Sequence, residues 1–318
     1  MGLYRSVLAV AGSTGQEVID WEAAALAAKE STPPGSLALT AAERRAYAAD
    51  VREARQEIEQ LTDRSITLPG SVEIQDRHHW IDANSETFRR IFSPLETHVG
   101  ASHAAARTIN TATMSVLLGF LGRNVLGQYD PLLLADGTDD HALYFVHPNI
   151  GRVATELSVD FDRFRRWIAF HEVTHAAEFT SAPWLSEHLE RNLTEGLETL
   201  TSGQLRTDAF EELDVTMTVV EGYAELLMDH AFDDEYADLR VKLDERRAGG
   251  SPLKRLLGRL LGLGIKRRQY ERGKHFFETV AANRSITFAE KVWASPAALP
   301  TTTELDDPYR WIQRMDNE

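Results

Sequence analysis

The feature that most constrains this chain is the run His171-Glu172-Val173-Thr174-His175, which lies in a stretch with helical hydrophobic spacing. Residues four apart lie on one face of a helix, so both imidazoles can bind one metal ion. Glu172 is offset from His171 by about 100° and can reach a water molecule on that ion. The HExxH pattern therefore predicts a helix that carries a metal site and a general base.

The residues around this pattern favour a helix that packs against the rest of the protein. A buried helix avoids charges because they would lose their hydration. The uncharged residues here are Ile168, Ala169, Phe170, Val173, Thr174, Ala176 and Ala177. Asp160 and Asp162 precede the helix and can cap its N-terminus. The alternative interpretation is a core helix whose two histidines are satisfied by hydrogen bonds.

Composition narrows the choice of metal. The chain has 318 residues, which allows one large domain or two ordinary ones, and 43% of them are hydrophobic, enough for a packed core. It contains no cysteine, so disulfides are impossible and every metal ligand must be His, Asp or Glu. Zn²⁺ fits a set of two histidines and one carboxylate, and we expect it as the cofactor.

Charge and hydropathy exclude some classes of partner. The net charge of −15 argues against nucleic-acid binding, which needs a basic surface. No apolar run reaches about 18 residues, so we expect no integral membrane association. Because no clear signal peptide opens the chain, we expect a cytoplasmic protein. The basic segment 246–274 leaves open a helix on a membrane surface, although a core-packed helix with a basic outer face is favoured.

The predicted fold class is mainly α (α+β), with one small antiparallel sheet or hairpin. A long helix is expected over 41–62, with Thr40 as its cap, and further helices follow the HExxH pattern. Residues 131–136 and 142–146 have strand character and are separated by a turn signal at 136–140, which predicts a hairpin. Its free edge could hold an extended peptide, and a purely structural hairpin is an equal alternative.

We expect a single domain over 1–318, because no shift in composition marks a boundary. Residues 1–128 form its N-terminal helical portion. Residues 129–318 hold the hairpin, the HExxH helix and the C-terminal helices.

A catalytic zinc site needs a third protein ligand and one open position. Two Glu-Gly pairs follow the motif, Glu195-Gly196 and Glu221-Gly222. Glu221 is favoured because its neighbours are apolar, so that an unpaired carboxylate would be costly there and metal binding would remove the cost. Glu195 remains the alternative, and a site in which neither glutamate is the third ligand also remains open. We expect Gly222 to allow close approach of the motif helix.

Other polar side chains are candidates for supporting roles. Glu225 and Asp229 follow Glu221 on the same helix face, where one could hydrogen-bond a ligand histidine, or both could form a solvated face. The oxyanion of the reaction needs a donor, often Tyr or His. The candidates are Tyr223, His230, Tyr270 and His275, of which we take Tyr223 and His230 as catalytic candidates beside Glu172.

With these residues in hand, the chain resembles a bacterial zincin-like family of zinc metallohydrolases whose substrate is unknown. The matching stretches are WIDAN at 80–84, VHPNI at 146–150, residues 167–185 around HEVTHAAEF and APWL, VVEGYAELLMD at 219–229, residues 264–277, VWASP at 292–296, LPT at 299–301 and DP at 307–308. Members are often labelled as associated with biosynthesis of a deazaflavin coenzyme. The resemblance implies a mostly helical zincin-like fold, with the motif histidines and Glu221 as metal ligands.

These observations predict a zinc-dependent hydrolase, a metallopeptidase or amide hydrolase that acts on a peptide or small amide through a metal-activated water. Glu172 would be its general base. One alternative is a non-catalytic binding protein that keeps this scaffold with a structural or vestigial metal site. Another is a membrane-peripheral accessory protein that acts through the basic segment. The sequence does not predict an oligomeric state.

Overall fold

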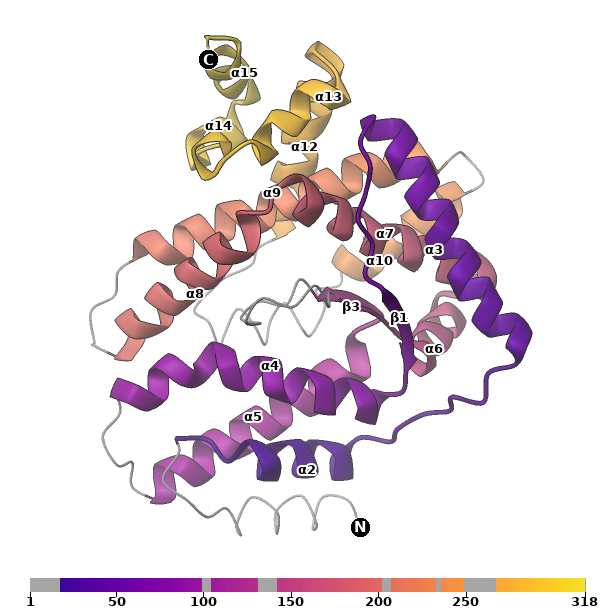
Figure 1. Ribbon diagram of the computed structural model, residues 1–318, viewed down its shortest axis with the longest axis vertical. Helices are drawn as coiled ribbons and strands as arrows, with labels where there is room; N and C mark the ends of the chain where they lie inside the picture. Colours follow the sequence, from indigo (N-terminus) through magenta and orange to yellow (C-terminus); the bar gives the residue numbers. More distant parts are fainter. Residues whose placement is uncertain are drawn as a thin grey trace.

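The computed structural model describes residues 18–98, 104–130, 142–201, 207–232, 236–248 and 267–317. Helices dominate these residues and one small sheet lies among them (Figure 1), so the predicted fold class is confirmed. The expected strand at 131–136, its turn, and residues 249–266 of the basic segment lie outside the described residues.

Three helices from the first part of the chain pack together at the lower end of the molecule in Figure 1. They are α2 (Trp21–Ser31), α4 (Arg77–His98) and α5 (Ala104–Asn124). Their shared core includes Trp80, Ile81 and Leu118. They form their own hydrophobic cluster, distinct from the larger one around the motif helix.

The long helix α3 (Ala41–Thr62) forms where the sequence predicts it. Thr40 accepts a hydrogen bond from the backbone N–H of Glu43, and the Glu43 side chain accepts one from the backbone of Thr40, which completes a capping box. The helix packs along the motif helix. Between the two, the buried Arg165 donates to Asp50 at 2.6 Å, so a charged pair holds them together.

The sheet contains β1 (Ser71–Gln75), β2 (Gly127–Asp130) and β3 (Ala142–Val146) in the order β1-β3-β2. The expected strand at 142–146 is confirmed. It pairs antiparallel with β2 and parallel with β1, so the sheet is mixed. β1 was not predicted, because its alternation of Val72 and Ile74 with polar residues covers only five residues, three of which are exposed.

The remaining helices build the larger core, and α6 and α7 among them contact the sheet. They are α6 (His147–Leu157), α7 (Phe161–Ser181), α8 (Leu185–Thr201), α9 (Thr207–Ala231), α10 (Ala237–Ala248), α12 (Arg267–Asn283), α13 (Ile286–Ala289), the 3₁₀ helices η2 (Glu290–Trp293) and η3 (Pro296–Ala298), α14 (Thr302–Asp306) and α15 (Pro308–Asn317). Phe164 and Phe170 of α7 are fully buried, as are Phe276 and Trp311 near the C-terminus. The motif helix therefore lies within the main hydrophobic core.

Helices α9 and α12 cross in backbone contact at two glycines. A Cβ on Gly222 would lie 2.5 Å from the carbonyl carbon of Gly273, and one on Gly273 would lie 2.4 Å from the carbonyl oxygen of Thr218. The expectation for Gly222 was therefore right about close packing and wrong about the partner, which is α12. The absence of both side chains lets α12 support the helix that carries Glu221.

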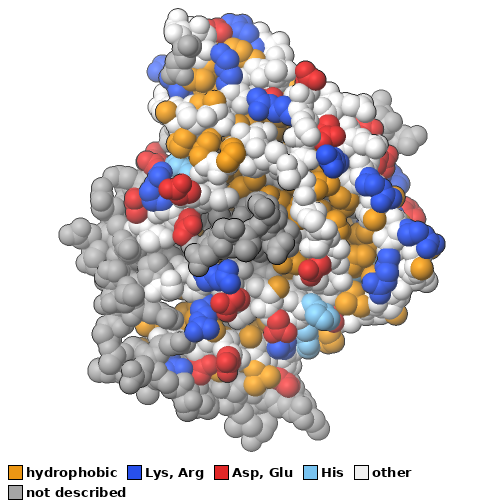
Figure 2. All heavy atoms as spheres, viewed as in Figure 1, with side chains coloured by type: hydrophobic (Ala, Val, Ile, Leu, Met, Phe, Trp, Pro, Cys, Tyr) orange, Lys and Arg blue, Asp and Glu red, His pale blue; other side chains and the backbone are white. Residues whose placement is uncertain are grey.

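The surface of the described residues mixes charges of both signs. On the face shown in Figure 2, Lys and Arg side chains are interspersed with Asp and Glu, and hydrophobic side chains gather near the middle. None of the described helices combines the length and hydrophobicity that crossing a bilayer requires.

Candidate metal centre

Helix α7 places the HExxH residues through ordinary local rules. Asp160 caps its N-terminus by accepting a hydrogen bond from the backbone N–H of Arg163 at 3.0 Å. The N–H of Ala182 donates to the carbonyl of Glu178 at the other end. Between these ends, the apolar residues are buried in the core, so the position of His171 and His175 is fixed by the packing of the whole helix.

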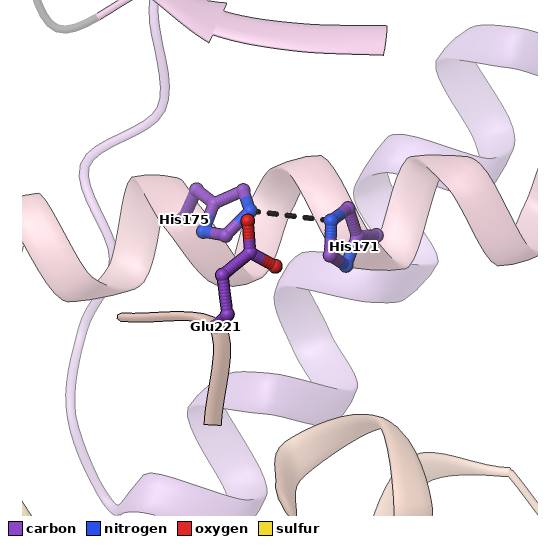
Figure 3. A group of neighbouring side chains, drawn as sticks. All are labelled: His171, His175 and Glu221. Carbon is purple, nitrogen blue, oxygen red and sulfur yellow. Dashed lines mark hydrogen bonds between the residues drawn. The ribbon is translucent and has the colours of Figure 1, made fainter. Parts of the chain in front are cut away.

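The two histidines and Glu221 converge on one point, as Figure 3 shows. One potential ligand atom from each residue lies within 4.8 Å of the others. The two Nε2 atoms are 3.3 Å apart. Two nitrogens bound to one tetrahedral zinc ion at about 2.0–2.1 Å would be separated by about 3.3 Å. The residues present therefore fit a zinc ion in the donor set and in the spacing of the imidazoles.

A buried carboxylate fixes the orientation of His175. Nδ1 of His175 lies 2.8 Å from Oε2 of Glu178. Glu178 is fully buried one turn further along α7. When Nδ1–H donates to this carboxylate, Nε2 presents a lone pair, as a metal ligand must. The sequence analysis missed Glu178, although its i+3 spacing from His175 was a usable signal.

The same contact determines the charge of the pair. Burial lowers the pKa of His175, but the negative charge and hydrogen bond of Glu178 outweigh it and raise that pKa to about 10. Burial also raises the pKa of Glu178 to about 7, against the opposing effect of His175. Oε1 of Glu178 has no hydrogen-bond partner among the described residues. Glu178 therefore favours positive charge at His175, which a metal ion on Nε2 would supply in place of a proton.

Glu172 follows His171 directly in the buried part of α7. It projects from α7 toward β2, is 6% exposed, and accepts a hydrogen bond from the backbone N–H of Tyr129 at 3.0 Å. Burial raises its pKa to about 7, against the opposing effects of His175 and of the Tyr129 amide. A carboxyl group with this pKa can both accept and release a proton near neutral pH.

The structure places three of the four candidate oxyanion donors. Tyr223 is 2% exposed and its hydroxyl donates to Glu290 at 3.1 Å. Burial and this carboxylate raise the pKa of Tyr223 well above its usual value. His230 is exposed near the end of α9 and its Nδ1–H donates to the Leu226 carbonyl. His275 is also exposed, and the side chain of Tyr270 lies outside the described residues. Tyr223 and His230 each have a hydrogen-bond partner outside the ligand set, and their roles as catalytic candidates stay predictions.

The structure also shows where the other carboxylates considered for the site lie. Glu195 is exposed on α8, and the cluster found among the described residues contains Glu221. Asp229 forms ion pairs with Arg240 at 3.1 Å and Lys274 at 2.9 Å, which draw it toward α10 and α12. The role expected for Glu225 in supporting a ligand histidine stays a prediction.

The chain is similar to a known protein family and to a solved structure. A family model described as zincin-like metallopeptidase matches residues 19–207 and 195–312. The fold is similar to a crystal structure from Chloroflexus aurantiacus, provisionally described as a hydrolase with a novel fold, with a TM-score of 0.76, 30% identity and 99% of each chain covered. No curated protein matches the chain. Neither match bears on the deazaflavin association. The chain belongs to the zincin-like metallopeptidase family.

Proposed function

We propose that this protein is a zinc-dependent hydrolase of peptide or small amide bonds. The observation that carries the proposal is the convergence of His171, His175 and Glu221 within 4.8 Å of one another, next to the buried carboxylate of Glu172. Membership of a family described as zincin-like metallopeptidase supports it.

The ligands and the base have separate roles. His171 and His175 would hold the ion through Nε2 and Glu221 through a carboxylate oxygen, while Glu178 keeps His175 in the correct tautomer. A zinc ion held there makes its water acidic enough to lose a proton near neutral pH and polarises the substrate carbonyl.

Glu172 handles the proton of the reaction. It accepts a proton from the attacking water as the new C–O bond forms, and it returns that proton to the amine nitrogen as the C–N bond breaks. The raised pKa of Glu172, about 7, suits a group that must be ionised before attack and protonated after it. Atoms balance as one water added across one amide bond.

The test is a screen of the zinc-loaded protein against a library of peptides and small amides. We expect Glu172→Gln to keep its zinc and to lose activity by about 10²–10⁴-fold, the usual contribution of a general base. Glu187→Gln, which changes an exposed carboxylate on α8, is the matched control and should retain full activity.

Two other outcomes would change the conclusion. Zinc bound by the wild type without hydrolysis of any library member would favour a non-catalytic binding protein on the same scaffold. Hydrolysis that survives in Glu172→Gln would show that another group acts as the base.

A further inference from the structure

The backbone of β2 presents hydrogen-bonding groups away from the sheet. The carbonyl of Leu126 accepts from the N–H of Val146 at 2.8 Å. Because inward and outward positions alternate along an antiparallel pair, Gln128 also faces β3, and Gly127 and Tyr129 turn their backbone groups outward. Among the described strands β2 lies at an edge of the sheet, and this outward edge meets helix α7.

The side chain of Glu172 contacts that outward edge of β2. Its Oε2 accepts a hydrogen bond from the outward N–H of Tyr129 at 3.0 Å. To reach it, the side chain passes directly over Gly127. A Cβ on this residue would lie 2.6 Å from Cγ, 2.7 Å from Oε1 and 2.8 Å from Cδ of Glu172. Cβ contacts below 3.0 Å essentially never occur, so any side chain at this position would require the carboxylate of Glu172 or the strand to shift.

Moving the Glu172 carboxylate away from Gly127 would cost free energy. The contact with Gly127 involves Cγ and Cδ as well as the terminal oxygen, so a small rotation of the carboxylate does not relieve it. Glu172 and Tyr129 are 6% and 9% exposed. Displacing the carboxylate would leave a buried backbone N–H without its partner.

We propose that Gly127 and the backbone amide of Tyr129 position Glu172 for catalysis, an inference that rests on the proposed function. Both are positioning residues, because they act through Glu172. The outward N–H at Tyr129 is thereby taken, so an extended peptide cannot pair with β2 at that point while the base is in place. The edge expected to hold a peptide belongs to the hairpin of 131–136 and 142–146, whose first strand lies outside the described residues, so that expectation stays a prediction.

Hydrogen exchange of the Tyr129 amide tests the contact directly and needs neither zinc nor substrate. In the wild type this amide should be protected despite its place at a strand edge. Glu172→Ala should accelerate its exchange by about tenfold, as expected when one hydrogen bond is lost. Glu172→Gln should keep the protection, because its carboxamide oxygen can still accept. Equal exchange in the wild type and Glu172→Ala would overturn the proposal.

Gly127→Ala tests the positioning role, with Gly70→Ala as its matched control, since a Cβ on Gly70 meets nothing within 4 Å. Gly127→Ala should keep its zinc, because the ligands lie on α7 and α9. On the best substrate of the screen, its kcat should fall by about 100-fold with KM little changed, as expected for a misplaced catalytic group. Full kcat together with wild-type exchange at Tyr129 would overturn the proposal. A wild type that hydrolyses nothing would refute the proposed function instead, and the exchange experiment would still decide whether the contact exists.

Discussion

At the scale of single residues, the pair His175 and Glu178 explains how a charged cluster survives in the core. A carboxylate that is completely buried is costly unless it is paired and hydrogen-bonded. Glu178 meets this requirement with one oxygen, on Nδ1 of His175, and the other oxygen has no described partner. This buried arrangement lowers the stability of the fold but fixes the orientation of the His175 imidazole. That combination is typical of a functional site.

This predicts that Glu178→Gln weakens zinc binding. Loss of the carboxylate removes the charge that makes His175 a better ligand, and we expect zinc affinity to fall by about 10–100-fold. Competition with a chromophoric chelator measures the affinity. Glu22→Gln, at an exposed position of α2, is the control, and equal affinity in Glu178→Gln and the wild type would contradict the assigned role.

The two ligand histidines could be predicted from the sequence because their geometry is local, whereas Glu221 lies on another helix and was favoured only for its apolar neighbours. The i, i+4 spacing of His171 and His175 places both on one helix face, and Glu178 obeys the same rule and could have been found with it. Tyr223 could not be judged in this way. Its partner Glu290 is distant in sequence, and no local pattern shows that its hydroxyl is already used. The contact of Gly127 with Glu172 is likewise set only by tertiary packing.

At the scale of elements, the crossing of α9 and α12 connects packing to the site. Gly222 faces α12, and the adjacent Glu221 faces α7. Neighbours in a helix point about 100° apart, so one turn of α9 serves both helices. Any displacement of α9 from α12 therefore moves a ligand.

Gly222→Ala should destabilise the protein and weaken zinc binding. The added methyl would overlap the backbone of Gly273, and we expect a loss of about 1–3 kcal/mol in the free energy of unfolding, as for other overpacked sites. Gly151→Ala in α6 is the matched control, since its Cβ meets only a ring carbon of Phe161 at 4.0 Å. There the better helix propensity of alanine should add about 0.5–1 kcal/mol. Denaturant unfolding of the two variants measures these changes in the free energy of unfolding. Equal changes in Gly222→Ala and Gly151→Ala would contradict this role of Gly222.

Elements with strong local signals were predictable and those defined by distant pairing were not. Thr40 and Glu43 form a capping box that is visible in the sequence, and α3 begins there. β1 pairs in parallel with β3, far along the chain, and it offers only two apolar residues, Val72 and Ile74, in a run of five. Parallel pairing depends on the intervening helices, so neither the strand nor its register can be derived from the segment alone.

At the scale of the whole molecule, a charged contact fastens the C-terminal helices. Arg314 of α15 donates to both carboxylate oxygens of Glu304 at 2.8 and 2.9 Å, and to the carbonyls of Ala297 and Leu299. Trp311 then inserts into the main core. Near the top of the molecule in Figure 1, the ion pair thus joins α15 to α14, and Trp311 anchors α15 in the main core.

This attachment should depend on pH. Burial raises the pKa of Glu304, but its hydrogen bonds with Arg314 and the Thr301 backbone outweigh burial and lower it below 4.5. A depressed carboxyl pKa stabilises the fold above the unfolded value and loses that effect as pH falls through the folded value. Glu304→Gln should therefore reduce the free energy of unfolding by about 1 kcal/mol at neutral pH, a figure limited by solvent screening.

Urea unfolding across pH measures this effect. The difference between Glu304→Gln and the wild type should shrink as pH falls below 4.5, because the protonated glutamate comes to resemble glutamine. Glu245→Gln, at an exposed position of α10, should show no such dependence. A difference that stays constant with pH would mean that the ion pair does not supply the stability.

The most direct measurement is the zinc content of the purified protein, determined by elemental analysis for the wild type and three alanine variants. The account predicts about one zinc per chain in the wild type and in Glu195→Ala. It predicts loss of that zinc in His171→Ala and in Glu221→Ala, because both residues belong to the converging cluster. A wild type that holds no zinc even after zinc is added back would contradict the account. So would a Glu221→Ala variant that retains the ion while Glu195→Ala loses it.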